Sequence, residues 1–344
     1  MGVTNADAPR LTRLRDVAEL AGVSFKTVSN VVNGYQHVTE KTRLRVQQAI
    51  DELDYRPNLS ARALRGGHSG VIALAVPELT IPYFAELASS VIRAAEKQSW
   101  TVLIDQTDGV RAREQSVVSG IRGQQIDGLI YSPIALSAAE LAGYAGRTPV
   151  VLLGEQVHGG SMDHVAVDNV GAAEEATLHL ASIGRRRIGA IGYQGAGAGE
   201  SARLRAEGYE SAMAKCGLKA PARFRQQTPH WHRADGTAAM TRMLIGGKPP
   251  DAVFCFNDLL ALGAIRCLLQ RGLRVPDDVA VIGFDDIEEG RFSTPSLTTI
   301  QPDKEEIGQV AVDYLKNRLA ARTDIPAREH VAAHTLVVRE STGG

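Results

Sequence analysis

Residues 14–24 read LRDVAELAGVS and residues 25–32 read FKTVSNVV, and these two stretches decide how the first part of the chain folds. In the first stretch, apolar residues recur at helical spacing from Leu14 to Ala21. Gly22 suits the left-handed conformation that ends a helix. The pattern predicts two short helices joined by a glycine-containing turn, which is a helix-turn-helix.

The second helix has one polar face that suits contacts with a DNA duplex. Lys26 can donate to guanine, Asn30 can pair with base edges, and Phe25 can pack on a thymine methyl group or a sugar. Small polar side chains nearby suit phosphate contacts, which position a protein without reading sequence. On helix pattern alone, a three-helix domain with an incidentally polar face remains the simpler interpretation. The candidate DNA contacts of this region are Phe25, Lys26, Thr27, Ser29, Asn30, Asn33 and Thr39.

A short connector follows, in which residues 57–67 read PNLSARALRGG. Proline suits a helix start and the glycine pair suits its end. An isolated helix shorter than ~12 residues is marginal in water. We therefore expect this segment to be helical only when something braces it, the alternative being a plain flexible linker.

Beyond residue 70, apolar strand-like runs alternate with amphipathic helical stretches. This alternation predicts parallel sheets covered by helices. About 270 residues are more than one such core usually holds, so two α/β lobes are expected. Parallel α/β sheets bind ligands at the carboxyl ends of their strands, which places a ligand site in the cleft between the lobes.

Composition limits the possible classes of protein. The 344 residues carry 38 Lys and Arg against 39 Asp and Glu, while residues 10–66 carry ten against six. This mildly basic first region is a weak indication of nucleic-acid binding. No apolar run reaches the ~18 residues of a membrane span, and the first ten residues are polar. The three cysteines lack the CxxC spacing of a metal site or a redox motif. We expect a cytoplasmic protein without a disulfide, metal or cofactor.

Motifs of common enzymes are not found in the sequence. The glycine-rich residues 192–199 fit neither the dinucleotide fingerprint nor the phosphate-binding loop, and no GxSxG or HExxH occurs. His230 and His232 have no carboxylate partner in the sequence nearby, so a solvated loop is preferred to a metal site. The sequence therefore does not favour an enzyme.

Four ordered motifs resemble the signature of the lactose/galactose-repressor (LacI) family. They are RDVAELAGVS at 15–24, TVSNVVNG at 27–34, VTEKTR at 38–43 and LDYRPN at 53–58. The resemblance implies a small all-α helix-turn-helix head and a two-lobed α/β body of the periplasmic-binding-protein type with parallel sheets. It divides the chain into an arm and head at 1–56, a hinge helix or linker at 57–69, and a ligand-binding and dimerisation body at 70–344. The expected lobes are 70–167 with 298–325, and 168–297 with 326–344.

In this family the hinge helices of a dimer pair in the minor groove of the operator. The resemblance places Leu64 at the wedge between base pairs, Arg62 near phosphates, and Asn58 and Ala61 on the same segment. Inserting an apolar wedge kinks DNA in exchange for more contact. We therefore expect a homodimer on a pseudo-palindromic operator.

The resemblance continues through the body, at SARLR (201–205), FND (256–258) and PDDVAVIGFDD (276–286). It implies a cleft with polar side chains that suit sugar hydroxyls, and with aromatic faces. Arg205 and Asp285 could instead form a structural ion pair, and Phe84 is nearly as well explained as core. Glu155 and Glu78 are weaker candidates. The candidate ligand contacts are Tyr83, Phe84, Asp168, Arg205, Trp231, Asn257 and Asp285.

These features predict a repressor that a mono- or disaccharide releases from DNA. The alternative is a regulator whose DNA binding is strengthened by a corepressor such as a purine or by a phosphoprotein partner. A solute-binding protein or sugar enzyme is a remote third possibility, and residues 14–65 argue against it.

Overall fold

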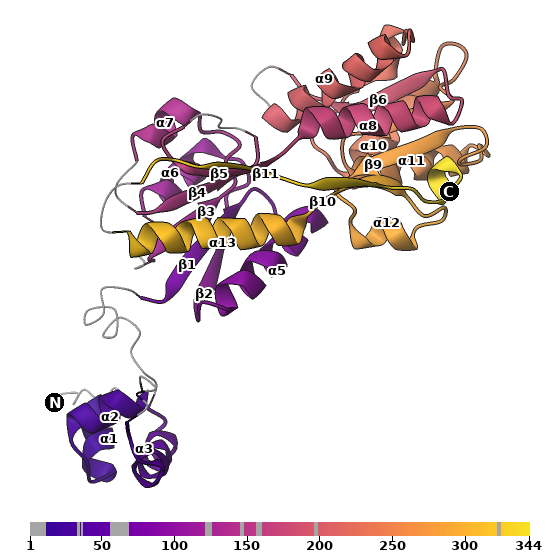
Figure 1. Cartoon of the computed structure of the whole chain (residues 1–344). Coiled ribbons are helices and arrows are strands. Elements are labelled where there is room, and N and C mark those ends of the chain that lie inside the picture. The colour runs from indigo at the N-terminus through magenta and orange to yellow at the C-terminus, as the bar shows by residue number, and fades with distance from the viewer. Residues whose placement is uncertain are drawn as a thin grey trace, which may run out of the picture. The chain divides into compact units, whose positions relative to one another are not determined.

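The computed structural model describes residues 12–32, 35, 37–55, 69–120, 126–144, 148–155, 160–195, 199–321 and 325–344. The chain forms two compact units, Met1–Ser69 and Gly70–Gly344, which we call the head and the body (Figure 1). Among the described residues, no helix is both long and apolar enough to cross a bilayer.

The head contains the predicted helix-turn-helix. Its helices are α1 (Leu14–Leu20), α2 (Phe25–Val32) and α3 (Glu40–Glu52). Val17, Val28 and Val46, one from each helix, are fully buried and form the centre of its core. Gly22, with φ +60°, makes the turn between α1 and α2. This part of the expected fold is confirmed.

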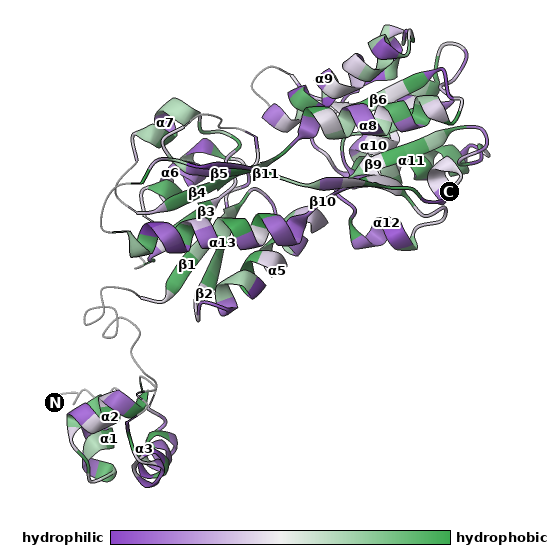
Figure 2. Cartoon of the chain, viewed as in Figure 1, coloured by the Kyte–Doolittle hydropathy of each residue, from purple (hydrophilic) through white to green (hydrophobic). Residues whose placement is uncertain are grey.

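The first lobe of the body is built on a parallel six-stranded sheet in the order β11-β5-β4-β3-β1-β2. Helices α5, α6, α7 and α13 belong to this lobe (Figure 1). Because its central strands β1, β3 and β4 are buried on both faces, they read as continuous apolar runs, which are green in Figure 2. The elements are β1 (Val71–Val76), α5 (Pro82–Glu96), β2 (Thr101–Gln106), α6 (Arg111–Val118), β3 (Gly128–Tyr131), α7 (Ala138–Ala142), β4 (Val150–Leu153), β5 (Asp163–Val167), α13 (Lys304–Ala320) and β11 (Glu329–Ala332).

The second lobe has a six-stranded sheet in the order β12-β10-β9-β8-β6-β7. Its strands are parallel except for the antiparallel pair of β10 and β12. The two-lobed α/β body is therefore confirmed. Its elements are α8 (Asn169–Ser182), β6 (Ile188–Tyr193), α9 (Glu200–Lys215), β7 (Arg225–Gln227), α10 (Arg233–Leu244), β8 (Ala252–Cys255), α11 (Asp258–Gln270), β9 (Ala280–Phe284), α12 (Glu288–Phe292), β10 (Thr298–Pro302) and β12 (His334–Val337).

The division of the C-terminal segments between the lobes differs from the expected one. Residues 298–302 were expected in the first lobe, but β10 pairs with β9 of the second sheet. Residues 329–332 were expected in the second lobe, but β11 pairs with β5 of the first. The chain thus passes between the lobes after β5, after β10 and between β11 and β12. Each of these two short segments suits either sheet, so only its strand pairing decides to which sheet it belongs.

The helix α13 returns to the first lobe and packs against α5. Gly308 permits this close approach, because an added Cβ would lie 2.9 Å from the carbonyl carbon of Ser90. Both helices turn apolar side chains inward and polar ones outward, as the alternating colours of α13 show (Figure 2). The packing brings the start of α13, at Lys304, beside the first lobe and next to the crossover.

Candidate functional site

A cavity of about 360 Å³ lies between the lobes of the body. It is lined by residues that follow strands of both sheets, as expected for parallel α/β lobes. Six of the seven predicted ligand contacts line it: Tyr83, Phe84, Arg205, Trp231, Asn257 and Asp285. The lining also includes Glu78, Glu155, Ser201, His230 and His232.

Asp168, the seventh predicted contact, is not among the lining residues. Its side chain is exposed at the start of α8, where the carboxylate accepts a 2.8 Å hydrogen bond from the backbone N–H of Gly171. An N-cap of this kind satisfies one of the free N–H groups of the first helical turn. Asp168 is therefore best described as a helix cap.

Arg205 is held rigidly on α9 by protein partners. Its Nε donates to the Asn169 side chain at 2.7 Å, and one terminal nitrogen donates to the Phe256 carbonyl. The guanidinium lies 3.5 Å from the centre of the Phe284 ring. Burial lowers the pKa of Arg205 from its usual value, although arginine remains charged in proteins. The site thus contains a fixed positive group with its orientation already set.

Asp285 follows β9 directly and faces Arg205. One carboxylate oxygen lies 3.9 Å from a terminal nitrogen of Arg205. Burial raises the pKa of Asp285 to about 7, against the opposing effect of Arg205 and Lys304. Its backbone has φ +113°, a conformation that non-glycine residues rarely adopt. The strained turn directs the carboxyl group into a buried site.

Asn257 has a structural role in the wall of the cavity. Its amide nitrogen donates to the carbonyl of Trp231 at 3.0 Å, and its oxygen accepts from the N–H of Leu260 at 2.9 Å. Trp231 is fixed a second time, because its indole N–H donates to the Gly192 carbonyl at 3.0 Å. Each end of the Asn257 amide therefore has a protein partner, and the residue caps α11 while it positions Trp231.

Two side-chain contacts join the lobes at the cavity. The Ser201 hydroxyl donates to a Glu155 carboxylate oxygen at 2.6 Å. Nε2 of His232 lies 3.4 Å from a carboxylate oxygen of Glu78. From the sequence, Glu155 and Glu78 were the weaker candidates and His232 was expected in a solvated loop. Glu155 could have been ranked higher, since it follows the buried strand β4 by two residues.

Glu114 was missed altogether. Its buried carboxylate accepts hydrogen bonds of 2.9–3.2 Å from the backbone N–H groups of Ile134, Ala135 and Leu136. Ser132 and Ile134 of the same loop line the cavity. Glu114 lies within a helix, where a charged residue is ordinarily exposed, so the sequence contains no sign of this role.

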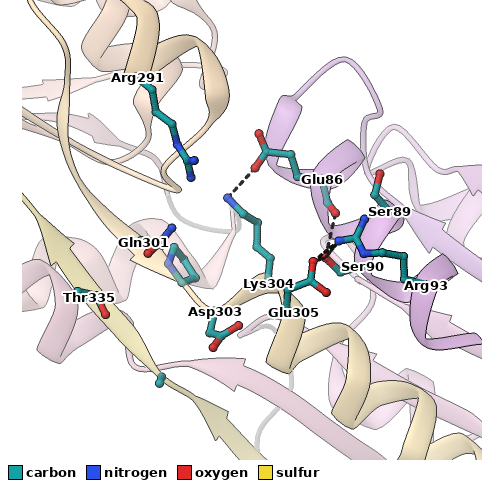
Figure 3. Close-up of a pocket in the computed structure, with 12 residues that line it drawn as sticks. Glu86, Ser89, Ser90, Arg93, Arg291, Gln301, Asp303, Lys304, Glu305 and Thr335 are labelled. Carbon is teal, nitrogen blue, oxygen red and sulfur yellow. Dashed lines mark hydrogen bonds and ion pairs between the residues drawn. The ribbon is translucent and has the colours of Figure 1, made fainter.

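A second hollow, of about 460 Å³, lies between α5 and β10 (Figure 3). It is next to the segment in which the chain passes from β10 to α13. Lys304 reaches across it to the Glu86 carboxylate at 2.7 Å. The same ammonium donates to the carbonyls of Asp285 and Asp286. Lys304 therefore links the end of β9, which forms the wall of the ligand cavity, with helix α5 of the first lobe.

In the head, the predicted DNA-contacting face of α2 is only partly open. Phe25 and Lys26 are exposed, whereas Thr27, Ser29 and Asn30 are half-buried. Thr39 caps α3 by accepting from the N–H of Thr42 at 3.4 Å. The remaining candidates, Asn33, Asn58, Ala61, Arg62 and Leu64, lie outside the described residues, as does the expected hinge helix.

Comparisons with known proteins agree with this architecture. Residues 13–58 match the lacI family of bacterial regulatory proteins, and residues 177–342 match a periplasmic binding protein-like domain. A helix-turn-helix head joined to such a body defines a class of ligand-responsive transcriptional regulators.

Two relatives and one solved structure extend the match over nearly the whole chain. The ribose operon repressor of Escherichia coli K12 is 33% identical over 315 residues, covering 91% of this chain and 94% of the relative. The transcriptional repressor PurR of Haemophilus influenzae is 32% identical over 328 residues, covering 91% and 93%. The lac repressor dimer bound to operator and an anti-inducer superposes with a TM-score of 0.82 at 27% identity, covering 97% and 99%. The chain belongs to the LacI family.

Proposed function

We propose that this chain is a cytoplasmic transcriptional repressor that binds a pseudo-palindromic operator as a homodimer and is released by a mono- or disaccharide. The observation that carries the proposal is the interlobe cavity, in which Arg205, Asp285 and Glu155 face a common space beside Trp231. Carboxylates and guanidinium groups suit sugar hydroxyls, and an aromatic ring suits the C–H face of a sugar. Similarity to a repressor of a ribose operon supports a sugar ligand.

The head supplies the DNA-binding part of the proposal. Lys26 and Phe25 are exposed on α2, the helix that lies in the major groove in helix-turn-helix proteins. The hinge, with Leu64 as a wedge and Arg62, Asn58 and Ala61 beside it, would add minor-groove contacts. The ligand would act by changing how the hinge is braced, because ordering of a marginal helix couples two distant sites.

A homodimer is part of the same proposal. The similar lac repressor is a dimer on its operator. Phe292 on α12 is 79% exposed, and aromatic side chains are enriched at interfaces between proteins. Two-fold symmetry would present two heads to two operator half-sites.

Selection of binding sites from a random pool of duplex DNA by the full-length protein tests the proposal. We expect a pseudo-palindrome, and at least tenfold weaker binding to it when the correct sugar is present. Failure to enrich any two-fold symmetric sequence would overturn the DNA-binding part. Tighter binding in the presence of a purine would instead support the corepressor alternative, which similarity to PurR favours.

A further inference from the structure

The interlobe cavity has a pronounced excess of negative charge. Among the described residues that line it, five carry carboxylates and one carries a guanidinium. The carboxylates belong to Glu78, Asp108, Glu155, Glu200 and Asp285, and the guanidinium belongs to Arg205. Two imidazoles, of His230 and His232, complete the ionisable lining.

The single guanidinium is already partly engaged by protein groups. Its Nε is used by Asn169 at 2.7 Å, and one terminal nitrogen is used by the carbonyl of Phe256. Asp285 lies 3.9 Å away and counters its charge. An incoming phosphate would therefore compete with a carboxylate that is already present.

The carboxylates differ in how they are compensated. Asp108 pairs with Arg113, and Glu200 pairs with Arg203 at 2.8 Å; neither arginine lines the cavity. Glu155, which is buried, accepts only from neutral donors in the described part of the chain, namely the Ser201 hydroxyl and the Val167 N–H. Glu155 is thus a buried lining carboxylate that accepts no hydrogen bond from a charged donor among the described residues.

Two stretches that neighbour lining residues in the sequence contain no lysine or arginine. Residues 156–159 read QVHG and residues 196–198 read AGA, and both stretches are next in sequence to lining residues. Neither contains Lys or Arg. Sites that bind phosphate in proteins normally supply arginine, lysine or a cluster of free N–H groups.

We infer that the cavity selects ligands without an anionic group: it takes an uncharged or amine-bearing polyhydroxyl compound and rejects phosphorylated or carboxylated ones. The inference rests on the proposed function and narrows its ligand class. Ligand hydroxyls would donate to Glu155 and Asp285, which are acceptors when ionised. A phosphate in their place would be repelled by the like charges of the lining carboxylates.

Matched ligand pairs test the inference on the full-length protein. The pairs are D-ribose with D-ribose 5-phosphate, D-galactose with D-galactose 6-phosphate, D-glucose with D-glucuronate, sucrose with sucrose 6-phosphate, and inosine with inosine monophosphate. Thermal shift identifies the binding compounds and calorimetry measures their Kd values. We expect the uncharged member of the binding pair to bind at least 100-fold more tightly. Equal or tighter binding of a phosphorylated member would overturn the inference while leaving a ligand-controlled repressor intact.

A variant separates charge from shape. Glu155→Gln removes a buried lining carboxylate that no charged donor binds, so the ratio of Kd values within the binding pair should fall at least threefold. Glu207→Gln is the matched control, because Glu207 lies on α9, pairs with Arg203 at 3.0 Å and does not line the cavity. An unchanged ratio of Kd values in Glu155→Gln would show that shape, not charge, excludes the phosphate, and would contradict the inference.

The panel also separates this inference from the proposed function. Binding of inosine alone would contradict the saccharide proposal, while the comparison with inosine monophosphate would still test charge selection. Binding of no uncharged compound in any pair would overturn both.

Discussion

Ser201, at the start of α9 in the second lobe, donates a 2.6 Å hydrogen bond to the Glu155 carboxylate of the first lobe. Both residues line the ligand cavity, so this bond joins the lobes at the site itself. A ligand that contacts both lobes binds more tightly when a protein contact already holds them together, because binding then has to restrict less motion of the lobes.

Ser201→Ala should therefore weaken effector binding three- to tenfold. Stability should fall by only about 1 kcal/mol, the usual contribution of one hydrogen bond. Calorimetric titration and thermal unfolding measure the two effects. Ser211→Ala is the control, since Ser211 on the same helix makes a 2.8 Å bond to Glu174 within the second lobe. Equal losses of affinity in the two variants would contradict a role for the interlobe bond.

Asp285 should make stability depend on pH. Its pKa is raised by burial from 3.8 to about 7, so the folded protein binds this proton more tightly than the unfolded chain. Stability from this group is therefore greatest at low pH and is lost as pH rises toward 7. The full shift corresponds to about 4 kcal/mol.

In Asp285→Asn this loss disappears. The difference in unfolding free energy, variant minus wild type, should increase from pH 5 to pH 7 and level off above pH 8. Denaturant unfolding at several pH values measures it. Asp278→Asn is the control, because Arg274 shifts the pKa of Asp278 in the opposite direction, down to about 2. The contribution of Asp278 to the free energy of unfolding is therefore constant between pH 5 and pH 7. A flat difference for Asp285→Asn would refute the prediction.

Glu114→Gln should destabilise the body and weaken effector binding together. The variant loses the charged acceptor of the N–H groups of Ile134, Ala135 and Leu136, for an expected loss of about 2–3 kcal/mol. The loop they belong to lines the cavity. Glu140→Gln, which alters an exposed carboxylate that caps α7, should leave effector affinity unchanged. A stable Glu114→Gln protein with normal affinity would exclude the positioning role.

Phe292→Glu should dissociate the proposed homodimer. A charge replacing a 79% exposed aromatic ring has little effect on the fold of a monomer, but it is expensive to bury in an interface. Sedimentation velocity should show a monomer, and operator binding should fall at least tenfold. Leu269→Glu is the comparison, as Leu269 is exposed on α11. A dimeric Phe292→Glu protein would place the interface elsewhere.

Asn30→Ala should reduce sequence discrimination by the head. Loss of a bidentate contact to a base reduces discrimination by about 1–3 kcal/mol. Competition between the selected operator and random DNA, measured by anisotropy, gives this quantity. Lys219→Ala removes one positive charge from the body and should leave the preference unchanged. An unaltered preference in Asn30→Ala would mean that Asn30 does not read a base.

The sequence was sufficient to predict the classes of element and to choose candidate ligand residues, six of which line the cavity. In parallel α/β lobes a residue that follows an apolar strand lies at the binding edge, and Asp285 and Asn257 obey that rule. Asp168 also follows a strand, β5, yet its carboxylate is used to cap α8. Whether a side chain faces the cleft or its own helix depends on backbone angles that spacing does not reveal.

Other parts of the structure depend on contacts between distant segments. The segments that form β10 and β11 were assigned to the wrong lobes, because a strand of only four or five residues fits either sheet. Glu114 and the loop it holds are about 20 residues apart, and Ser201 and Glu155 are 46 apart. Pairings of this kind appear only after the sheets are assembled.

The passage of the chain between the lobes at the ends of β5, β10 and β11 limits how the body can move. Three peptide segments join the two halves, so sliding and separation are restrained and a pivot about these segments is the freedom that remains. A small turn there would produce its largest displacement at the farthest points of each half. Substitutions among the residues that line the pocket would leave these three connections unchanged.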